Sequence, residues 1–134
     1  MPDTTVSLYD PEIFHALGTH HKPGMCHIYV HTAVVREIDG IKNGNNRRAG
    51  SAREIARDLD RWGSYGDLIN GVPLPSGGVV HVFSDYDPID ERASVADNRI
   101  VSGAMVLNRI NHGNVTVLTT DHNMRTIARV VLIT

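Results

Sequence analysis

The sequence predicts a single α/β domain in which a largely parallel β-sheet is covered by helices on both faces. Short stretches rich in β-branched and aromatic residues alternate along the chain with longer stretches whose apolar residues recur at helical spacing. Segments rich in Gly, Pro and Asn separate them, and no internal repeat is visible. A chain of 134 residues has the length of one compact domain. Strands that alternate with helices typically pair in parallel, so we expect helices on both sides of the sheet.

The first part of the chain predicts a helix, a strand and a second helix. Residues 12–17, EIFHAL, have the apolar spacing of a short helix that Gly18 ends. Residues 27–31, HIYVH, alternate as a strand does, and residues 33–42, AVVREIDGIK, place apolar side chains at helical spacing. The polar stretch at residues 42–50, KNGNNRRAG, predicts a loop.

A long amphipathic helix is expected from Ser51 onward. Ser51 and Glu54 form a capping-box pattern. The apolar face of this helix comprises Ala52, Ile55, Ala56, Leu59 and Trp62. Residues 64–78 are rich in Gly, Pro and Ser, and they lead into a strand at residues 79–83, VVHVF.

The last part of the chain predicts one more helix and two strands. Residues 85–96 form an irregular acidic loop by their composition. Residues 97–110 have the pattern of a buried helix, and residues 115–119, VTVLT, that of a strand. Residues 129–134, RVVLIT, predict a short terminal strand.

Composition and charge exclude several classes of protein. A net charge of −2 is not that of a generic nucleic-acid coater, so affinity for polyanions would need a local basic patch or bound cations. The single cysteine excludes an intrachain disulfide framework. No apolar run approaches the roughly 20 residues that span a bilayer, and the polar first residues lack the apolar core of a signal peptide. We therefore expect a cytoplasmic protein with no membrane association.

Acidic residues follow the expected strands at the edge of the sheet where ligands bind. In such sheets, ligands lie at the carboxyl ends of the strands. Asp121 follows the strand at residues 115–119, Glu37 lies in the helix after the strand at residues 27–31, and Asp97 begins a predicted helix. Taken alone, Asp97 and Asp121 could each be a helix N-cap, so a capping and a metal-binding interpretation both stay open.

Several short motifs follow one another along the chain: DTTVSLYDPEIF, AVVREIDGIK, GSAREIARDLD, ADNRIVSGAM and VLTTDHNMR. In this order they resemble the successive motifs of PIN-domain nucleases, most closely the PIN modules at the N-terminus of PhoH-like ATPases. The resemblance covers nearly the whole chain. It implies that residues 1–134 form a single PIN-like domain, a three-layer α/β/α sandwich with a mostly parallel central sheet. The companion ATPase is not implied, because no G-x-x-x-x-G-K-[ST] motif occurs.

Carried over residue by residue, the resemblance implies a metal-binding cluster of four catalytic carboxylates: Asp3, Glu37, Asp97 and Asp121. Thr5 and Thr119 would be its supporting hydroxyls. Mg²⁺ or Mn²⁺ suits such a site, because hard cations take oxygen ligands. Two such ions about 3.5 to 4 Å apart could activate water and stabilise the leaving oxygen of a phosphodiester. The implied activity is that of an endoribonuclease that hydrolyses single-stranded RNA.

An acidic pocket would repel RNA unless cations and a basic rim hold the phosphate backbone. The candidates for this rim are Lys42, Arg47, Arg48 and Arg53, downstream of Glu37, and Arg125, one helical turn after Asp121. The arginines could instead form an ordinary polar helix face.

The start of the chain departs from the family pattern, because only Met1 and Pro2 precede Asp3. Three alternatives follow: the first strand is shortened, Asp3 is displaced, or another acid such as Asp10 compensates. Asn98 stands where many relatives have a further acid, which implies weaker metal binding. The alternative to an active enzyme is a catalytically weak or inactive PIN-like module that binds RNA or a partner protein. The resemblance also implies a homodimer, and a protein inhibitor or antitoxin is a candidate partner.

Zinc-type ligands gather in one stretch of the chain: His20, His21, Cys26, His27 and His31. Their spacing fits no standard zinc motif, which favours surface and packing histidines over a zinc site. A catalytic role for the cysteine thiol is disfavoured further, since nothing in the sequence marks a lowered pKa.

Overall fold

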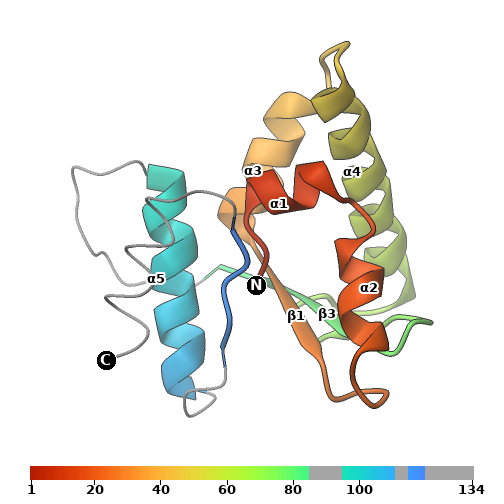
Figure 1. Cartoon of the computed structure of the whole chain (residues 1–134), viewed down its shortest axis with the longest axis vertical. Coiled ribbons are helices and arrows are strands. Elements are labelled where there is room, and N and C mark those ends of the chain that lie inside the picture. Colours follow the sequence, from red (N-terminus) through yellow and green to blue (C-terminus); the bar gives the residue numbers. More distant parts are fainter. Residues whose placement is uncertain (85–94, 111–114, 120–134) are drawn as a thin grey trace.

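The computed structural model describes residues 1–84, 95–110 and 115–119, with the backbone alone described over residues 95–99. The chain combines helices with a small sheet, in agreement with the predicted α/β class (Figure 1). The elements in order are α1 (Thr4–Tyr9), α2 (Ile13–Thr19), β1 (His27–His31), α3 (Thr32–Ile41), α4 (Arg47–Tyr65), β2 (Val72–Pro73), β3 (Val79–Phe83) and α5 (Val95–Ile110).

The named strands form a mixed sheet in the order β1-β3-β2. β1 and β3 pair in parallel over their whole length, from His27 opposite Val79 to His31 opposite Phe83. β2 pairs antiparallel to β3 at the sheet edge. The sequence did not predict β2. Pro73 of β2 fits an edge position, because a proline there removes no N–H group that a neighbouring strand needs for pairing.

A second strand pairing joins the two ends of the described chain. Pro2 and Leu118 form an isolated parallel bridge. The Asp3 N–H donates to the Leu118 carbonyl at 2.9 Å, and the Leu118 N–H donates to the Met1 carbonyl at 3.0 Å. The first strand is therefore present in the shortened form that the sequence predicts. A strand was expected over residues 115–119. Within the described residues, this bridge is the strand pairing that the segment makes.

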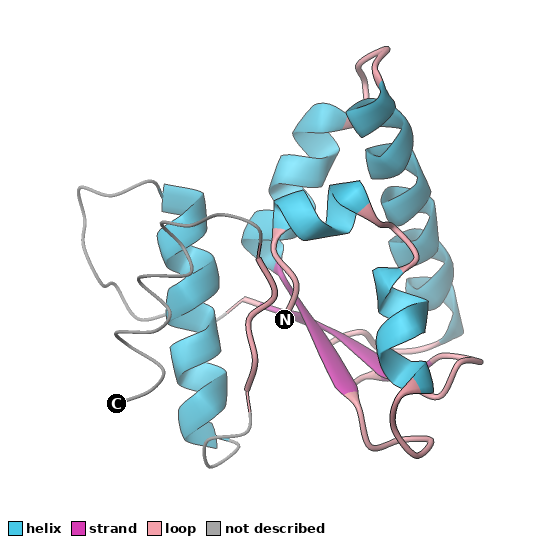
Figure 2. Ribbon diagram, viewed as in Figure 1, coloured by secondary structure: helices cyan, strands magenta, loops and turns pink. Residues whose placement is uncertain are grey.

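Helices flank the strands on both sides (Figure 2). α5 contacts β1 and α3, whereas α2 contacts β1 and α4 contacts β2. The core includes Phe14 and Trp62, whose rings pack edge to face with centroids 5.9 Å apart. The predicted apolar face of α4 is buried or half-buried. No described helix is long and apolar enough to cross a membrane.

Helix boundaries differ from the sequence prediction in three places. α4 begins at Arg47 rather than Ser51, because the Asn46 side chain accepts a hydrogen bond from the Ala49 N–H at 2.9 Å. The predicted Ser51 capping box is therefore wrong. α2 continues through Gly18, where a β-carbon would stand 2.4 Å from the backbone nitrogen of Gly78, so this glycine serves close packing rather than termination.

The third difference concerns the helix that was predicted to begin at Asp97. α5 begins two residues earlier, at Val95, which places Asp97 inside its first turn rather than at the N-cap. Two other expected segments lie outside the described residues. They are the terminal strand at residues 129–134 and the loop at residues 85–96, except for the last two residues of that loop.

Candidate active site

Asp3 stands at the junction of the Pro2–Leu118 bridge and helix α1. It is the N-cap of α1, where its Oδ1 accepts a hydrogen bond from the Val6 N–H at 2.8 Å. Its Oδ2 accepts a hydrogen bond from the Thr119 hydroxyl. The side chain is buried, with 2% of its surface exposed. Backbone pairing, the cap and the threonine together hold this carboxylate in place.

Glu37 approaches the same region from helix α3, which follows β1 directly. The helix begins at a cap in which the His31 Nδ1 accepts a hydrogen bond from the Ala33 N–H at 3.0 Å. Glu37 is half-buried, and its Oε1 accepts a hydrogen bond from the Thr4 hydroxyl at 2.8 Å. Thr4 is the residue after Asp3. Two acids far apart in sequence are thus joined through one threonine.

The threonine hydroxyl that contacts Glu37 belongs to Thr4 and not to Thr5, the neighbouring residue that the resemblance implied as a support of the cluster. Thr4 is buried and contacts Glu37, whereas Thr5 is exposed. Successive residues of a helix are turned by about 100° about its axis, so Thr4 and Thr5 of α1 face different surroundings. The two threonines that follow Asp3 in the sequence indicated a hydroxyl at this place. Nothing in the sequence indicated which of the two threonines faces α3. Thr119 lies where the resemblance implied, beside Asp3.

The remaining candidate acids are covered only in part. Asp121 and Arg125 lie outside the described residues, as does the side chain of Asp97. The backbone of Asp97 belongs to α5, which packs against α3, the helix of Glu37. Within the described part of the chain, no three His, Cys, Asp or Glu side chains gather into a metal site. Asp10 is exposed at the end of α1 and shows no contact with Asp3 or Glu37.

The basic residues expected at the rim have different surroundings. Lys42 forms an ion pair with Asp39, with the Nζ and Oδ1 atoms 2.6 Å apart. Arg53 donates through Nη1 to the carbonyls of Lys42 and Gly44, at 2.8 and 2.9 Å. Its guanidinium therefore ties the α3–α4 loop to α4, a structural task that sequence analysis did not assign to it. Arg47 and Arg48 are exposed in the first turn of α4.

The histidines expected in packing or surface roles make contacts of that kind. The Nδ1 of His27 and the Nε2 of His81 lie 2.8 Å apart. The ring of Tyr29 stacks on that of His81, with centroids 4.5 Å apart. Burial lowers the pKa of His81, a hydrogen bond with the Ile69 backbone raises it, and His27 lowers it again. The rings of His27, Tyr29 and His81 pack together on one face of β1 and β3.

Comparison with known proteins gives one finding. The family model described as "PIN domain" matches residues 1–134, the full length of the chain. No curated protein and no solved structure matched the chain.

Proposed function

Because the chain belongs to the PIN-domain family, we propose that it is a divalent-metal-dependent endoribonuclease that hydrolyses the phosphodiester bonds of single-stranded RNA. PIN domains are generally nucleases, and they generally use divalent metal ions. The RNA substrate, the endonucleolytic mode and the residues involved are parts of the proposal.

The observation that carries the proposal is the pair of carboxylates at Asp3 and Glu37, each supported by a threonine hydroxyl. A carboxylate offers about four lone-pair sites. Asp3 accepts two hydrogen bonds through its side chain and Glu37 accepts one, so both keep lone pairs for a cation. Oxygen donors are what Mg²⁺ and Mn²⁺ prefer, and the donor set therefore fits the metal that the family uses.

Asp97 and Asp121 complete the proposed ligand set. Support for Asp97 is the packing of α5 on α3, which brings the helix of Asp97 to that of Glu37. Support for Asp121 is its closeness in sequence to Thr119, whose hydroxyl donates to Asp3. When bound, the metal would supply an activated water and stabilisation of the leaving oxygen. The protein's own task is to hold four carboxylates in place and to position the RNA.

Phosphate contacts are proposed for Arg47 and Arg48, which are exposed, and for Lys42, Thr5 and Arg125. Lys42 can exchange Asp39 for a phosphate at little cost, because an exposed ion pair contributes only about 0–1 kcal/mol. Arg53 would act less directly, by holding the loop that carries Lys42. Aromatic residues make up only 5% of the chain, which favours backbone contacts over base stacking.

The cellular context is proposed on the resemblance alone. We propose a cytoplasmic homodimer whose activity a protein inhibitor of the antitoxin type controls. Light scattering on the purified chain tests the dimer, and a monomeric mass at assay concentrations would remove that part of the proposal.

Cleavage of an end-labelled single-stranded RNA tests the nuclease. We expect internal cuts with Mn²⁺ or Mg²⁺ and none with EDTA. Glu37→Gln and Asp97→Asn should each slow cleavage by more than about 100-fold, since changes outside the ligand shell alone cost about 10- to 100-fold. Asp60→Asn, at an exposed acid of α4, is the matched control and should cut at the normal rate. Cleavage that survives EDTA, or equal rates in all variants, would overturn the proposal. The absence of any cleavage with Mn²⁺ or Mg²⁺ would overturn it in favour of an inactive binding module.

A further inference from the structure

Two histidines from neighbouring strands direct ring nitrogens at each other. The Nδ1 of His27, on β1, lies 2.8 Å from the Nε2 of His81, on β3. The ring of Tyr29 stacks on that of His81 with an interplanar angle of 14° and holds it in place. His81 is buried and His27 is exposed. The pair therefore combines one fixed ring with one ring that solvent reaches.

The hydrogen bonds of His81 decide which of its nitrogens carries the lone pair. Burial lowers the pKa of His81, whereas a hydrogen bond with the Ile69 backbone raises it, as an acceptor of the ring proton does. Because Nε2 faces His27, Nδ1 is the nitrogen left to donate to Ile69. In the neutral ring the lone pair is then on Nε2, and His27 donates to it through Nδ1. A ring whose second nitrogen donates to a backbone carbonyl is typical of histidines that bind metals.

Gly71 keeps the space beside this lone pair open. It lies directly before β2 with a φ of 109°. A β-carbon at this position would stand 2.6 Å from the Cε1 of His81 and 3.0 Å from its Nε2. Any other residue would thus crowd the nitrogen, and its backbone would also be strained at this φ. The glycine therefore leaves the Nε2 atom of His81 uncovered on this side.

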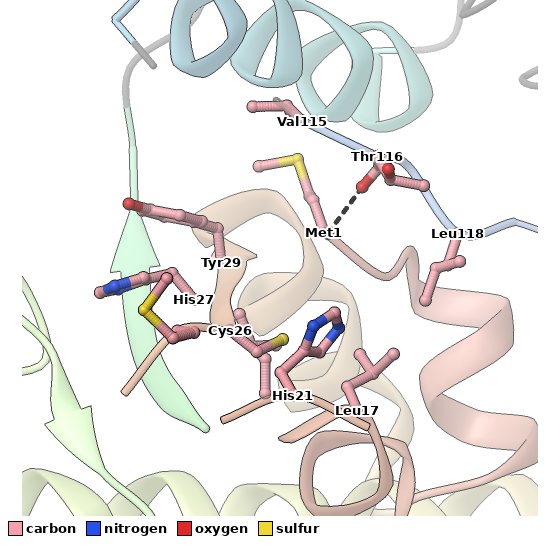
Figure 3. A pocket seen from close by; sticks show the side chains of 11 residues that line it. Met1, Leu17, His21, Cys26, His27, Tyr29, Val115, Thr116 and Leu118 are labelled. Atoms are coloured by element: carbon pink, nitrogen blue, oxygen red, sulfur yellow. Dashed lines mark hydrogen bonds between the residues drawn. The ribbon is translucent and has the colours of Figure 1, made fainter. Parts of the chain in front are cut away.

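The residues that neighbour His27 in sequence lie on a different side of the strand. Successive residues of an extended chain face opposite ways, so Cys26 is turned away from His27. Figure 3 shows the side chains of His27 and Tyr29 projecting to one side of β1. Cys26 and His21 lie to the other side. The ring that His27 does meet belongs to His81, 54 residues further along the chain, which the sequence alone did not connect to it.

The distance between the two nitrogens suits a shared ion after a small movement. Two imidazole nitrogens that each lie about 2.0–2.1 Å from a tetrahedral Zn²⁺ stand roughly 3.3 Å apart. The observed distance of 2.8 Å is shorter by about 0.5 Å, because a proton rather than an ion lies between the rings. His27 is exposed and is the first residue of β1, so its ring can make this movement while His81 stays in place.

We propose that His27 and His81 bind one divalent transition-metal ion of the Zn²⁺ type, through Nδ1 and Nε2 respectively, with water in its remaining positions. Imidazole nitrogens suit zinc and copper, whereas Mg²⁺ prefers oxygen ligands. On binding, the proton of His27 moves through solvent from Nδ1 to Nε2, so two neutral rings take up the ion without net release of a proton. The site lies at the start of β1, whereas α3, the helix of Glu37, follows its other end. It is therefore separate from the acidic cluster and does not rest on the nuclease activity.

Calorimetric titration of the untagged chain with Zn²⁺ tests the proposal. We expect one Zn²⁺ to bind to the pair in each chain. His27→Ala and His81→Ala should each weaken this binding by more than about tenfold, since changes outside the ligand shell alone cost about 10- to 100-fold. His27→Ala, at an exposed position, decides the test should the buried variant fail to fold.

Two matched controls separate this site from the other groups that could hold the ion. His21→Ala, beside Cys26, and Glu37→Gln, in the acidic cluster, should both bind Zn²⁺ as tightly as the parent chain. Loss of binding in either control would place the ion with that group and overturn the proposal. Parent-like binding in His27→Ala, or no Zn²⁺ binding by the parent, would overturn it as well.

Long-range nitrogen–proton NMR spectra of the imidazole rings locate the ion atom by atom. At mildly alkaline pH, where neutral histidines prevail, both rings should carry their proton on Nδ1 before Zn²⁺ is added. With Zn²⁺, the signals of Nδ1 of His27 and Nε2 of His81 should shift together, and the His27 proton should appear on Nε2. Signals of His81 that stay unchanged at saturating Zn²⁺ would overturn the proposal.

The bound ion should also join β1 to β3 more firmly. An ion that binds only the folded chain raises its stability in proportion to the logarithm of the excess of ion over the dissociation constant. Saturating Zn²⁺ should therefore raise the urea midpoint of the parent chain and leave that of His27→Ala unchanged. An equal rise in both chains would show that the stabilising ion binds elsewhere and would count against the two-histidine site.

Discussion

Protonation of the Met1 α-amino group should set part of the pH dependence of folding. Burial lowers the pKa of this group from 8.0 to about 6, because a charge is costly away from water. The unfolded chain keeps the proton up to about pH 8, so between pH 6 and pH 8 the unfolded state binds more protons than the folded state. The free energy of unfolding therefore rises with pH across this window. A pKa lowered by about 2 corresponds to about 2.7 kcal/mol.

A chain preceded by Gly-Ser provides the matched comparison, because it moves the charge away and puts a peptide N–H beside the Thr116 carbonyl. At about pH 5.5, below the folded pKa, this variant should be more stable than the parent by about 2–3 kcal/mol. By about pH 8.5 the part of the stability difference that comes from the buried charge should have disappeared. His81, whose pKa burial also lowers, is common to both chains, so its contribution cancels in the difference.

Urea unfolding followed by far-UV circular dichroism measures this difference, provided that both chains unfold in one transition. The parent must be shown by mass to retain Met1. A difference in unfolding free energy that stays constant from about pH 5.5 to about pH 8.5 would refute the reasoning. It would mean that the amino group is solvated in the folded chain.

Two further pairs of substitutions test the site and the fold. Thr4→Val removes the hydroxyl that donates to Glu37 and should slow RNA cleavage about 10- to 100-fold. Thr19→Val, at an exposed threonine at the end of α2, is the matched control and should leave the rate unchanged; equal single-turnover rates in the two variants would contradict the role given to Thr4. Asn46→Ala removes the cap of α4 and should lower the free energy of unfolding by about 1 kcal/mol. Ser51→Ala, within the helix, should change it by less than about 0.5 kcal/mol, and a larger loss there in urea denaturation would restore the capping-box interpretation.

The family and the fold class could be predicted because they depend on signals spread over the whole chain. The match of the PIN-domain model to residues 1–134 confirms the family, and the combination of helices with a small mixed sheet confirms the α/β class. Strong periodicity located β1, α3 and β3 within a residue. β2 was missed because a strand of two residues, Val72–Pro73, has no period to detect.

Local choices between equivalent residues could not be predicted. Asn46 and Ser51 are both good N-caps, and only the tertiary position of α4 decides that its first turn begins at the earlier one. Thr4 and Thr5 are identical in sequence terms, and the packing of α1 near α3 selects Thr4. Both corrections concern which of two chemically similar side chains faces a neighbouring element. The sequence alone does not answer this, because the answer depends on where that element lies in the folded chain.

The short first strand explains why Asp3 needs several supports at once. A single parallel bridge is a marginal anchor, since short isolated strand pairs have little stability in water. Here the Asp3 carboxylate also caps α1 and accepts from Thr119, so its position depends on a helix and on the 115–119 segment as well as on the bridge. The acid of the proposed metal site is therefore held by contacts that the short strand alone would not provide.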